Sequence, residues 1–140
     1  MSGPDQAFVL RDTDARGVVT LTLNRPLAFN ALSEEMLGAL QTELDAIAND
    51  ESARVVVLAA AGKAFCAGHD LKQMRAAPSL SYYRKLFDQC AAMMLAVQRL
   101  PVPVIARVQG IATAAGCQLV AMCDLAVAAS TAKFAVSRVN

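Results

Sequence analysis

The sequence predicts an α/β domain, in which buried strands alternate with helices along the chain. Two short apolar runs, Val55–Ala60 and Val104–Val108, of which only the second contains a polar residue, Arg107, are typical of strands buried in a parallel sheet. Two longer segments, residues 33–49 and 79–100, carry apolar residues at helical spacing. Hydrophobic residues make up 56% of the 140 residues, enough to bury a core. This alternation is typical of the α/β class.

The first predicted elements are a β-hairpin and a helix. Val18–Leu23 is rich in β-branched residues at alternating positions and predicts a strand. Residues 8–10 are expected to pair with it across the turn at residues 12–17. Pro26 ends the pattern, because proline has no N–H group for a sheet ladder. The helix predicted over residues 33–49 begins with a serine, a favoured N-cap, and two glutamates follow in its first turn.

The middle of the chain repeats the order strand, loop, helix. The strand Val55–Ala60 leads into a loop, "AAGKAFCAGHDL", at residues 60–71. A long helix is then predicted over residues 79–100. Pro101 and Pro103 end it, because proline cannot continue a helix.

The last third repeats this order in shorter elements. The strand Val104–Val108 is followed by a loop at residues 110–116 and a short buried helix over Ala115–Met122. A fourth core strand is expected at residues 125–129, and residues 134–136 are a further strand-like piece. Because no capping element follows, we expect residues 1–140 to be a single, truncated domain.

The charge balance excludes several classes of partner. Lys and Arg number 13 against 12 Asp and Glu, so no basic patch predicts binding to nucleic acid or to a membrane surface. No apolar run reaches the length of a membrane span. The first residues lack the features of a signal or transit peptide. The four cysteines form no CxxC pair, so we expect reduced thiols in a cytoplasmic protein and no metal site.

Two glycine-containing loops share one design. "FCAGHDL" (residues 65–71) and "GIATAAGCQL" (residues 110–119) each follow a buried strand and run into a helix. Small residues let a backbone approach a ligand closely, and a helix N-terminus offers N–H groups without acceptors. Two such loops together would bind an oxyanion, such as the enolate of a thioester. The alternative is that the glycines only form tight turns beside packed helices.

Four motifs together resemble the enoyl-CoA hydratase/isomerase (crotonase) family. They are "NRPLAFNAL" (24–32), "GKAFCAGHDL" (62–71), "PVPVIARVQGIATAAGCQLVAMCDLAVA" (101–128) and "AKFAV" (132–136), in the family's order and spacing. "AGHDL" and "GCQLVA" are similar to a subgroup of hydratase-domain proteins. The resemblance implies a crotonase-like spiral of β-β-α turns. It also implies a C-terminal helical region that drives homo-trimer or hexamer formation in full-length members and is missing here.

The resemblance also implies a ligand and its binding residues. The ligand is an acyl-CoA thioester, with coenzyme A as part of the substrate and no other cofactor. The oxyanion hole would be formed by the backbone N–H groups of His69 and Ala115, the latter at the middle of a usual Gly-Gly-Gly. Because Leu27 stands where a Lys or Arg often contacts phosphate, that contact would fall to Arg25 or Lys72. The residues implied along the coenzyme A path are Arg25, Leu27, Ala28, Ala67, His69, Asp70, Leu71 and Gly116.

The sequence departs from the family at its catalytic glutamates. Gln118 occupies the first position, Arg138 occupies the second, and Ser137 replaces the usual proline. A glutamine side chain holds a water by hydrogen bonds but cannot accept a proton at neutral pH. Hydration by the usual route is therefore in question.

Other residue types leave alternatives open. His69, the only histidine, is either a general base or contributes only its backbone N–H group. Asp70 is expected to cap a helix, and Asp124 to cap or turn the end of a helix. Phe87 either packs in the core or lines an acyl pocket.

Two functions remain from the sequence. The first is an enzyme of 2-enoyl-CoA metabolism, a lyase or isomerase that stabilises an enolate while Gln118 orients water or substrate. The alternative is a non-catalytic acyl-CoA-binding or partner-regulating module. A carboxylate near Gln118 would favour the enzyme, and an apolar surround would favour the module.

Overall fold

A five-stranded sheet forms the body of the molecule. The computed structural model describes residues 6–136. The strand order in the large sheet is β1-β2-β3-β5-β7. Only the first pair is antiparallel, which confirms the predicted hairpin, and the remaining pairs are parallel, as predicted. The strands are β1 (Val9–Thr13), β2 (Val18–Leu23), β3 (Val55–Ala60), β5 (Val104–Val108) and β7 (Leu125–Ala128).

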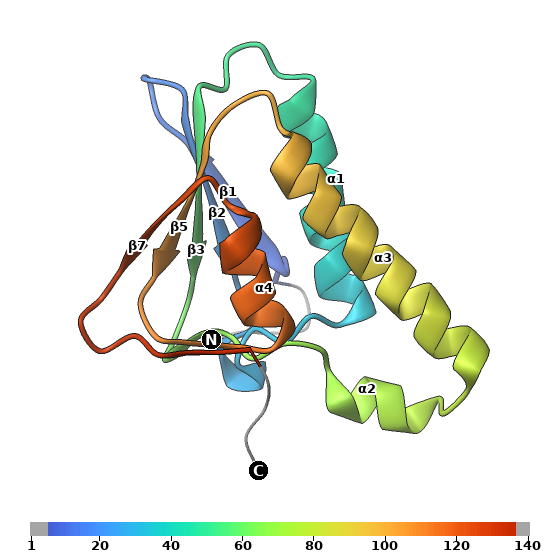
Figure 1. Ribbon diagram of the computed structural model, residues 1–140. Helices are drawn as coiled ribbons and strands as arrows, with labels where there is room; N and C mark the ends of the chain where they lie inside the picture. Colours follow the sequence, from blue (N-terminus) through green and yellow to red (C-terminus); the bar gives the residue numbers. More distant parts are fainter. Residues whose placement is uncertain (1–5, 137–140) are drawn as a thin grey trace.

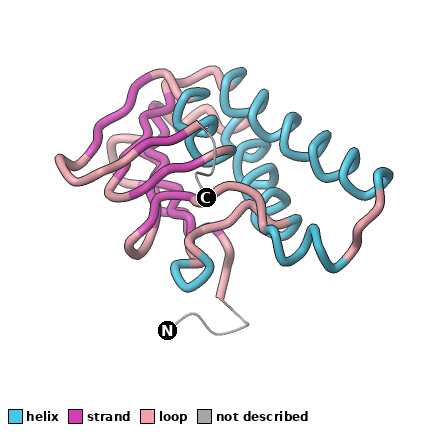
Figure 2. Tube along the Cα trace, turned by 60° about the horizontal axis from the view of Figure 1, so that its bottom comes forward, coloured by secondary structure: helices cyan, strands magenta, loops and turns pink. Residues whose placement is uncertain are grey.

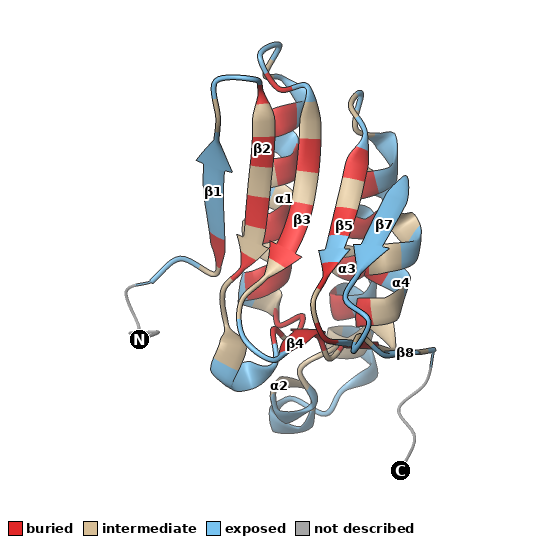
Figure 3. Cartoon of the chain, turned by 90° about the vertical axis from the view of Figure 1, so that its left-hand side faces the viewer, coloured by how far each residue is buried: buried red, intermediate tan, exposed pale blue. Residues whose placement is uncertain are grey.

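A second, small sheet lies at the end of the large one where its parallel strands finish (Figure 3). It has the order β4-β6-β8, with β4 (Ala64–Cys66), β6 (Ile111–Thr113) and β8 (Phe134–Ala135) all parallel. The sequence predicts loops at β4 and β6, and this prediction is wrong. Strands of two or three residues are too short to show a periodic pattern.

The helices confirm the expected β-β-α turns. Strands β3 and β4 precede α2 (Leu71–Ala76) and α3 (Leu80–Arg99), and strands β5 and β6 precede α4 (Ala115–Met122). Helix α1 (Glu34–Ala48) begins at Ser33, whose Oγ accepts a hydrogen bond from the N–H of Met36 at 3.1 Å. The predicted N-cap is therefore confirmed. Helix α2 is the helix that residues 65–71 were expected to enter, with Asp70 as its N-cap. Its bounds were not predicted, because six residues carry no readable period.

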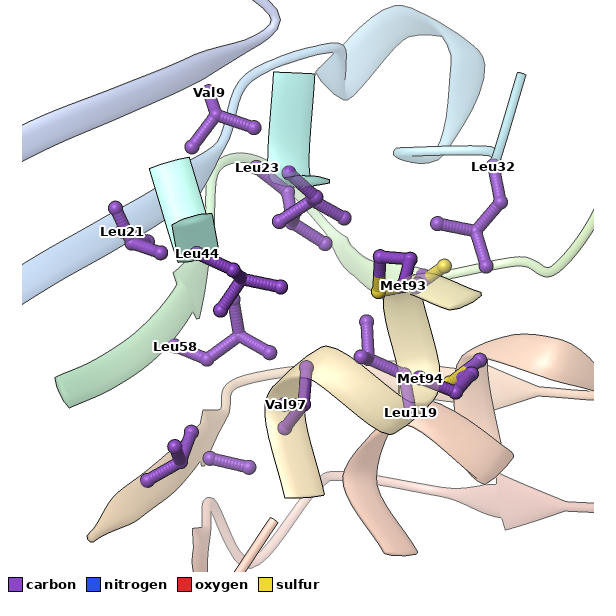
Figure 4. Packing of buried hydrophobic residues seen from close by; sticks show 14 of the residues in the cluster. Val9, Leu21, Leu23, Leu32, Leu44, Leu58, Met93, Met94, Val97 and Leu119 are labelled. Carbon is purple, nitrogen blue, oxygen red and sulfur yellow. The ribbon is translucent and has the colours of Figure 1, made fainter. Parts of the chain in front are cut away.

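The hydrophobic core lies between the large sheet and its helices. Helices α1, α3 and α4 lie on one side of the sheet (Figure 1), and a turned view separates the helical side from the strands (Figure 2). Leu21 and Leu23 of β2 meet Leu44 of α1 and Met93 of α3 in this layer (Figure 4), all at most 2% exposed. Burying such side chains contributes about 2 kcal/mol each.

Strand β7 departs from the prediction of a core strand. All four of its residues are exposed, with Leu125 and Val127 each 63% exposed. Among the described residues β7 pairs only with β5, so it forms an edge of the sheet (Figure 3). The opposite edge, β1, carries Arg11, which forms ion pairs with α1 and the turn after it. An apolar strand is buried only where a second layer of the structure covers it, and the apolar composition of β7 does not show whether such a layer is present.

Two further findings concern the described residues as a set. None of their helices combines the length and apolar character needed to cross a membrane. No three of their His, Cys, Asp or Glu side chains gather in a group that could hold a metal ion. Ser137 and Arg138 lie outside the described residues.

Candidate functional site

Two open cavities meet at one residue near the end of the sheet. The first, of about 360 Å³, lies between residues 27–31 and residues 67–72. The second, of about 560 Å³, is bounded by α4 and α3. His69 lines both cavities. A ligand that passed His69 would therefore place one part in each cavity.

The first wall of the first cavity is a strained loop. A 3₁₀ turn, η1 (Pro26–Ala28), is followed by Phe29 and Asn30, both with φ of +52°. Asn30 is fully buried, and its Oδ1 accepts a hydrogen bond from the N–H of Arg25 at 2.8 Å. Its Nδ2 donates to the carbonyl oxygens of Ala61 (2.9 Å) and Ala64 (3.0 Å). This side chain ties the loop to the end of β3 and to β4.

Backbone hydrogen bonds join this loop to the second wall. The N–H of Ala67 donates to the carbonyl oxygen of Phe29 at 3.0 Å, and the N–H of Leu32 donates to that of Gly68 at 2.7 Å. Leu32 and His69 form an isolated parallel β-bridge. The two walls of the first cavity are thus held as one unit, and the backbone of His69 is part of it.

Gly68 brings the two predicted glycine loops together. Its φ is +90°, and a Cβ there would lie 3.2 Å from the Cβ of Ala114 and 3.4 Å from the N of Ala115. Glycine is therefore required both for the backbone conformation and for the close approach. The backbone nitrogen of Ala115 therefore lies close to Gly68, the residue that precedes His69.

The turn before α4 is strained. Ala114 has φ of +52° and ψ of −124°, a conformation that favours glycine. Its N–H donates to the carbonyl oxygen of Ala135 at 2.9 Å, which holds the turn on β8. Ala115 is the first residue of α4, where N–H groups lack intrahelical acceptors and the helix dipole favours negative charge.

The second cavity has small residues on one side and aromatic rings on the other. Phe87 of α3 packs edge-to-face on His69, with ring centroids 5.0 Å apart and an interplanar angle of 87°. The small residues lining it are Ala114, Ala115, Cys117 and Ala121, and the larger ones are His69, Phe87, Gln118 and Val136.

Most of the residues implied along the coenzyme A path line the first cavity. They are Leu27, Ala28, Ala67, His69, Asp70 and Leu71, and Lys72 joins them. Asp70 also has its predicted capping role, since its Oδ1 accepts a hydrogen bond from the N–H of Gln73 at 3.1 Å. Asp124 was expected to cap or turn the end of a helix. Its Oδ2 instead accepts a hydrogen bond from the N–H of Val104 in β5 at 2.8 Å.

Arg25 and Gly116 do not line the first cavity. The guanidinium of Arg25 donates to the carbonyl oxygens of Gln6 (2.6 Å) and Asn24 (2.7 Å) and lies 3.6 Å over the ring of Phe8. It is held against the N-terminal segment, which leaves Lys72 as the cation among the described residues that line the first cavity. Gly116 is buried, and any Cβ on it would overlap the carbonyl oxygen of Cys66. Its role is close packing of α4 on β4.

No carboxylate lines the second cavity among the residues that the structure describes. Gln118 lies on its wall with an exposed side chain. The titratable side chains on that wall are the imidazole of His69 and the thiol of Cys117. The other described residues that line this cavity with Gln118 are largely apolar.

Sequence reasoning missed Asn30 and Phe29 as site residues. Phe29 lines the first cavity and Asn30 holds the loop that carries it. Asparagine tolerates positive φ, so an asparagine in a turn after proline was the available signal.

Comparisons with known proteins point to one family. The model of the family "Enoyl-CoA hydratase/isomerase" matches residues 13–140. A relative, the mitochondrial enoyl-CoA hydratase domain-containing protein 3 of Xenopus laevis, is 46% identical over 124 residues, which are 89% of this chain and 42% of that protein.

Solved structures show the same fold. A crystal structure of an enoyl-CoA hydratase from Mycobacterium smegmatis is 71% identical, with a TM-score of 0.92 over 94% of this chain and 51% of that one. The human enoyl coenzyme A hydratase domain-containing protein 3 is 38% identical, with a TM-score of 0.85 over 91% of this chain and 50% of that one. The chain thus spans about half the length of these proteins.

Proposed function

Because the chain belongs to the enoyl-CoA hydratase/isomerase family, we propose that it binds acyl-CoA thioesters across His69. The coenzyme A portion occupies the first cavity, where Lys72 is the cation available to a phosphate. The acyl group occupies the second cavity. Trimeric or hexameric assembly, which the resemblance implies for full-length members, belongs to the same proposal.

The observation that carries the proposal is the position of His69 on both cavities. A thioester carbonyl at this junction lies between the two parts of the ligand. Gly68 brings the backbone of Ala115 close to the same point. The N–H groups of His69 and Ala115 then donate to the carbonyl oxygen, and they bind it more strongly as it becomes an enolate. One such preset donor contributes about 3 kcal/mol to a transition state.

The reaction we propose is enolate chemistry on a 2-enoyl thioester. Addition of water needs a group that accepts a proton from the water and one that returns a proton to the α-carbon. Among the described residues of the second cavity, the imidazole of His69 is the side chain suited to accept a proton from the water at neutral pH, and the imidazolium so formed returns a proton to the α-carbon. Gln118 orients the water through its amide.

One observation favours a second candidate function. The described residues of the second cavity include no carboxylate. A chain that keeps the two N–H donors without an efficient acid and base would bind and polarise the thioester but not hydrate it. This is a non-catalytic acyl-CoA-binding module.

The test combines turnover with binding. Crotonyl-CoA loses its conjugated-thioester ultraviolet absorbance on hydration, and titration calorimetry measures its binding to the chain. Ala115→Pro removes one proposed donor at a helix position that tolerates proline, and circular dichroism checks its folding. Absorbance loss with the parent chain and none with the variant supports the enzyme. Binding without absorbance loss supports the module, and absence of binding to the folded chain rejects both.

A further inference from the structure

The second cavity presents a large aromatic ring to a wall of small residues. Phe87 is 48% exposed although it lines this cavity. Across from it, Ala115 and Ala121 of α4 leave space that no side chain of the described residues fills. A ring placed in this way gains burial when an apolar group lies between it and α4.

The charged side chains near Phe87 on α3 line a different surface. Arg84, Lys85 and Asp88 border a separate depression together with Leu80. None of the described side chains on the second cavity carries a fixed charge. A carboxylate brought into this cavity would lose water and gain no described cation as a partner, which is unfavourable.

We propose that Phe87 determines acyl specificity, and that the site takes uncharged, apolar acyl groups and rejects those ending in a carboxylate. This inference rests on the proposed function, because it places the acyl group in the second cavity. The contact of Phe87 with His69 puts the ring next to the proposed carbonyl position. The ring therefore contacts the first carbons of the acyl chain as well as bordering its path.

The test compares two acyl groups of equal chain length. Valeryl-CoA and glutaryl-CoA each carry five acyl carbons, and only the second ends in a carboxylate. Calorimetry measures the Kd of both, and of free coenzyme A, for the parent chain. We expect valeryl-CoA to bind at least about tenfold more tightly than glutaryl-CoA, a discrimination typical of a hydrophobic pocket.

Variants then assign the discrimination to Phe87. Phe87→Arg supplies a cation at the cavity and is expected to reverse the preference. Leu95→Arg makes the same change in charge on the same helix, at a residue that is 40% exposed and does not line the cavity. It should leave the ratio of the two Kd values unchanged. Phe87→Leu keeps an apolar side chain and should keep the preference for valeryl-CoA, with weaker binding.

The outcomes separate this inference from the function on which it rests. Equal binding of the two thioesters by the parent chain, or tighter binding of glutaryl-CoA, overturns the inference and leaves the proposed function in place. Absence of binding of all three ligands overturns both. If Phe87→Arg does not fold, Phe87→Ala, which removes the ring without adding a charge, should reduce the preference for valeryl-CoA, and an unchanged ratio of the two Kd values would overturn the role of Phe87.

Discussion

The side-chain nitrogen of Asn30 donates a hydrogen bond to the carbonyl oxygen of Ala64 at 3.0 Å, in a position from which solvent is fully excluded. This bond links the loop that forms one wall of the first cavity to a strand that leads into the other. The shape of the first cavity therefore depends on one buried amide.

We expect Asn30→Asp to destabilise the chain and to weaken coenzyme A binding. A carboxylate cannot donate to Ala61 and Ala64, and two buried carbonyl oxygens would face a negative charge. Losing such partners lowers the free energy of unfolding by about 3 kcal/mol, which urea unfolding measures. Asn30→Gly is the control, because it keeps the positive φ and adds no charge. A loss for Asp no larger than for Gly would contradict this account.

We expect Ala114→Gly to stabilise the chain. Ala114 has φ of +52° with ψ of −124°, and relief of such strain is worth about 1 kcal/mol after the entropy that glycine costs in the unfolded chain. Thermal unfolding followed by circular dichroism should show a higher Tm. A lower Tm would mean that the methyl group of Ala114 makes packing contacts worth more than the strain.

We expect Gly68→Ala to lower the affinity for acyl-CoA. A methyl group there lies 3.2 Å from the Cβ of Ala114, next to the proposed oxyanion hole, and φ of +90° disfavours alanine. Calorimetry with crotonyl-CoA measures the loss. Gly38→Ala is the matched control. Gly38 lies in α1, and the added methyl group would have only the side chain of Gln89 nearby, at 3.9 Å. That change should stabilise the helix by roughly 1 kcal/mol, and equal affinities for the two variants would argue against the proposed site.

The thiols should differ in their reaction with iodoacetamide. Burial, and then the neighbouring Asp124 carboxylate, raise the pKa of the Cys123 thiol to about 12. Since the thiolate is the nucleophile, almost none of Cys123 reacts at pH 8. Cys117 lines the open second cavity, so mass spectrometry should find it alkylated first. In denaturant all four cysteines should react, and alkylation of native Cys123 as fast as Cys117 would refute the assignment.

The order of the main elements was predictable because their signals are local. Ser33 as an N-cap, the alternation in Val18–Leu23 and the apolar runs of β3 and β5 each lie within one segment, and each is confirmed. The strands β4 and β6 were missed because their length hides any period.

The rest depended on distant neighbours. The exposure of β7 reflects the layers around it, since its apolar composition resembles that of β3. The position of the Arg25 guanidinium depends on Phe8 and on carbonyl groups in the N-terminal segment. The importance of Asn30 depends on Ala61 and Ala64, more than thirty residues along the chain. Such contacts leave no periodic mark in the sequence.

The left-handed backbone around the two cavities has a consequence for how this sequence can vary. Phe29, Asn30, Gly68 and Ala114 all have positive φ in the loops that form these walls. Positive φ limits which amino acids can replace these residues, whether or not they contact a ligand. In a saturation mutagenesis experiment selected only for folding, Asn30 and Gly68 should tolerate few replacements, while Phe29 should accept glycine or asparagine and Ala114 should accept glycine. At Asn30 and Gly68 the walls of the two cavities would then resist mutation as strongly as the core does.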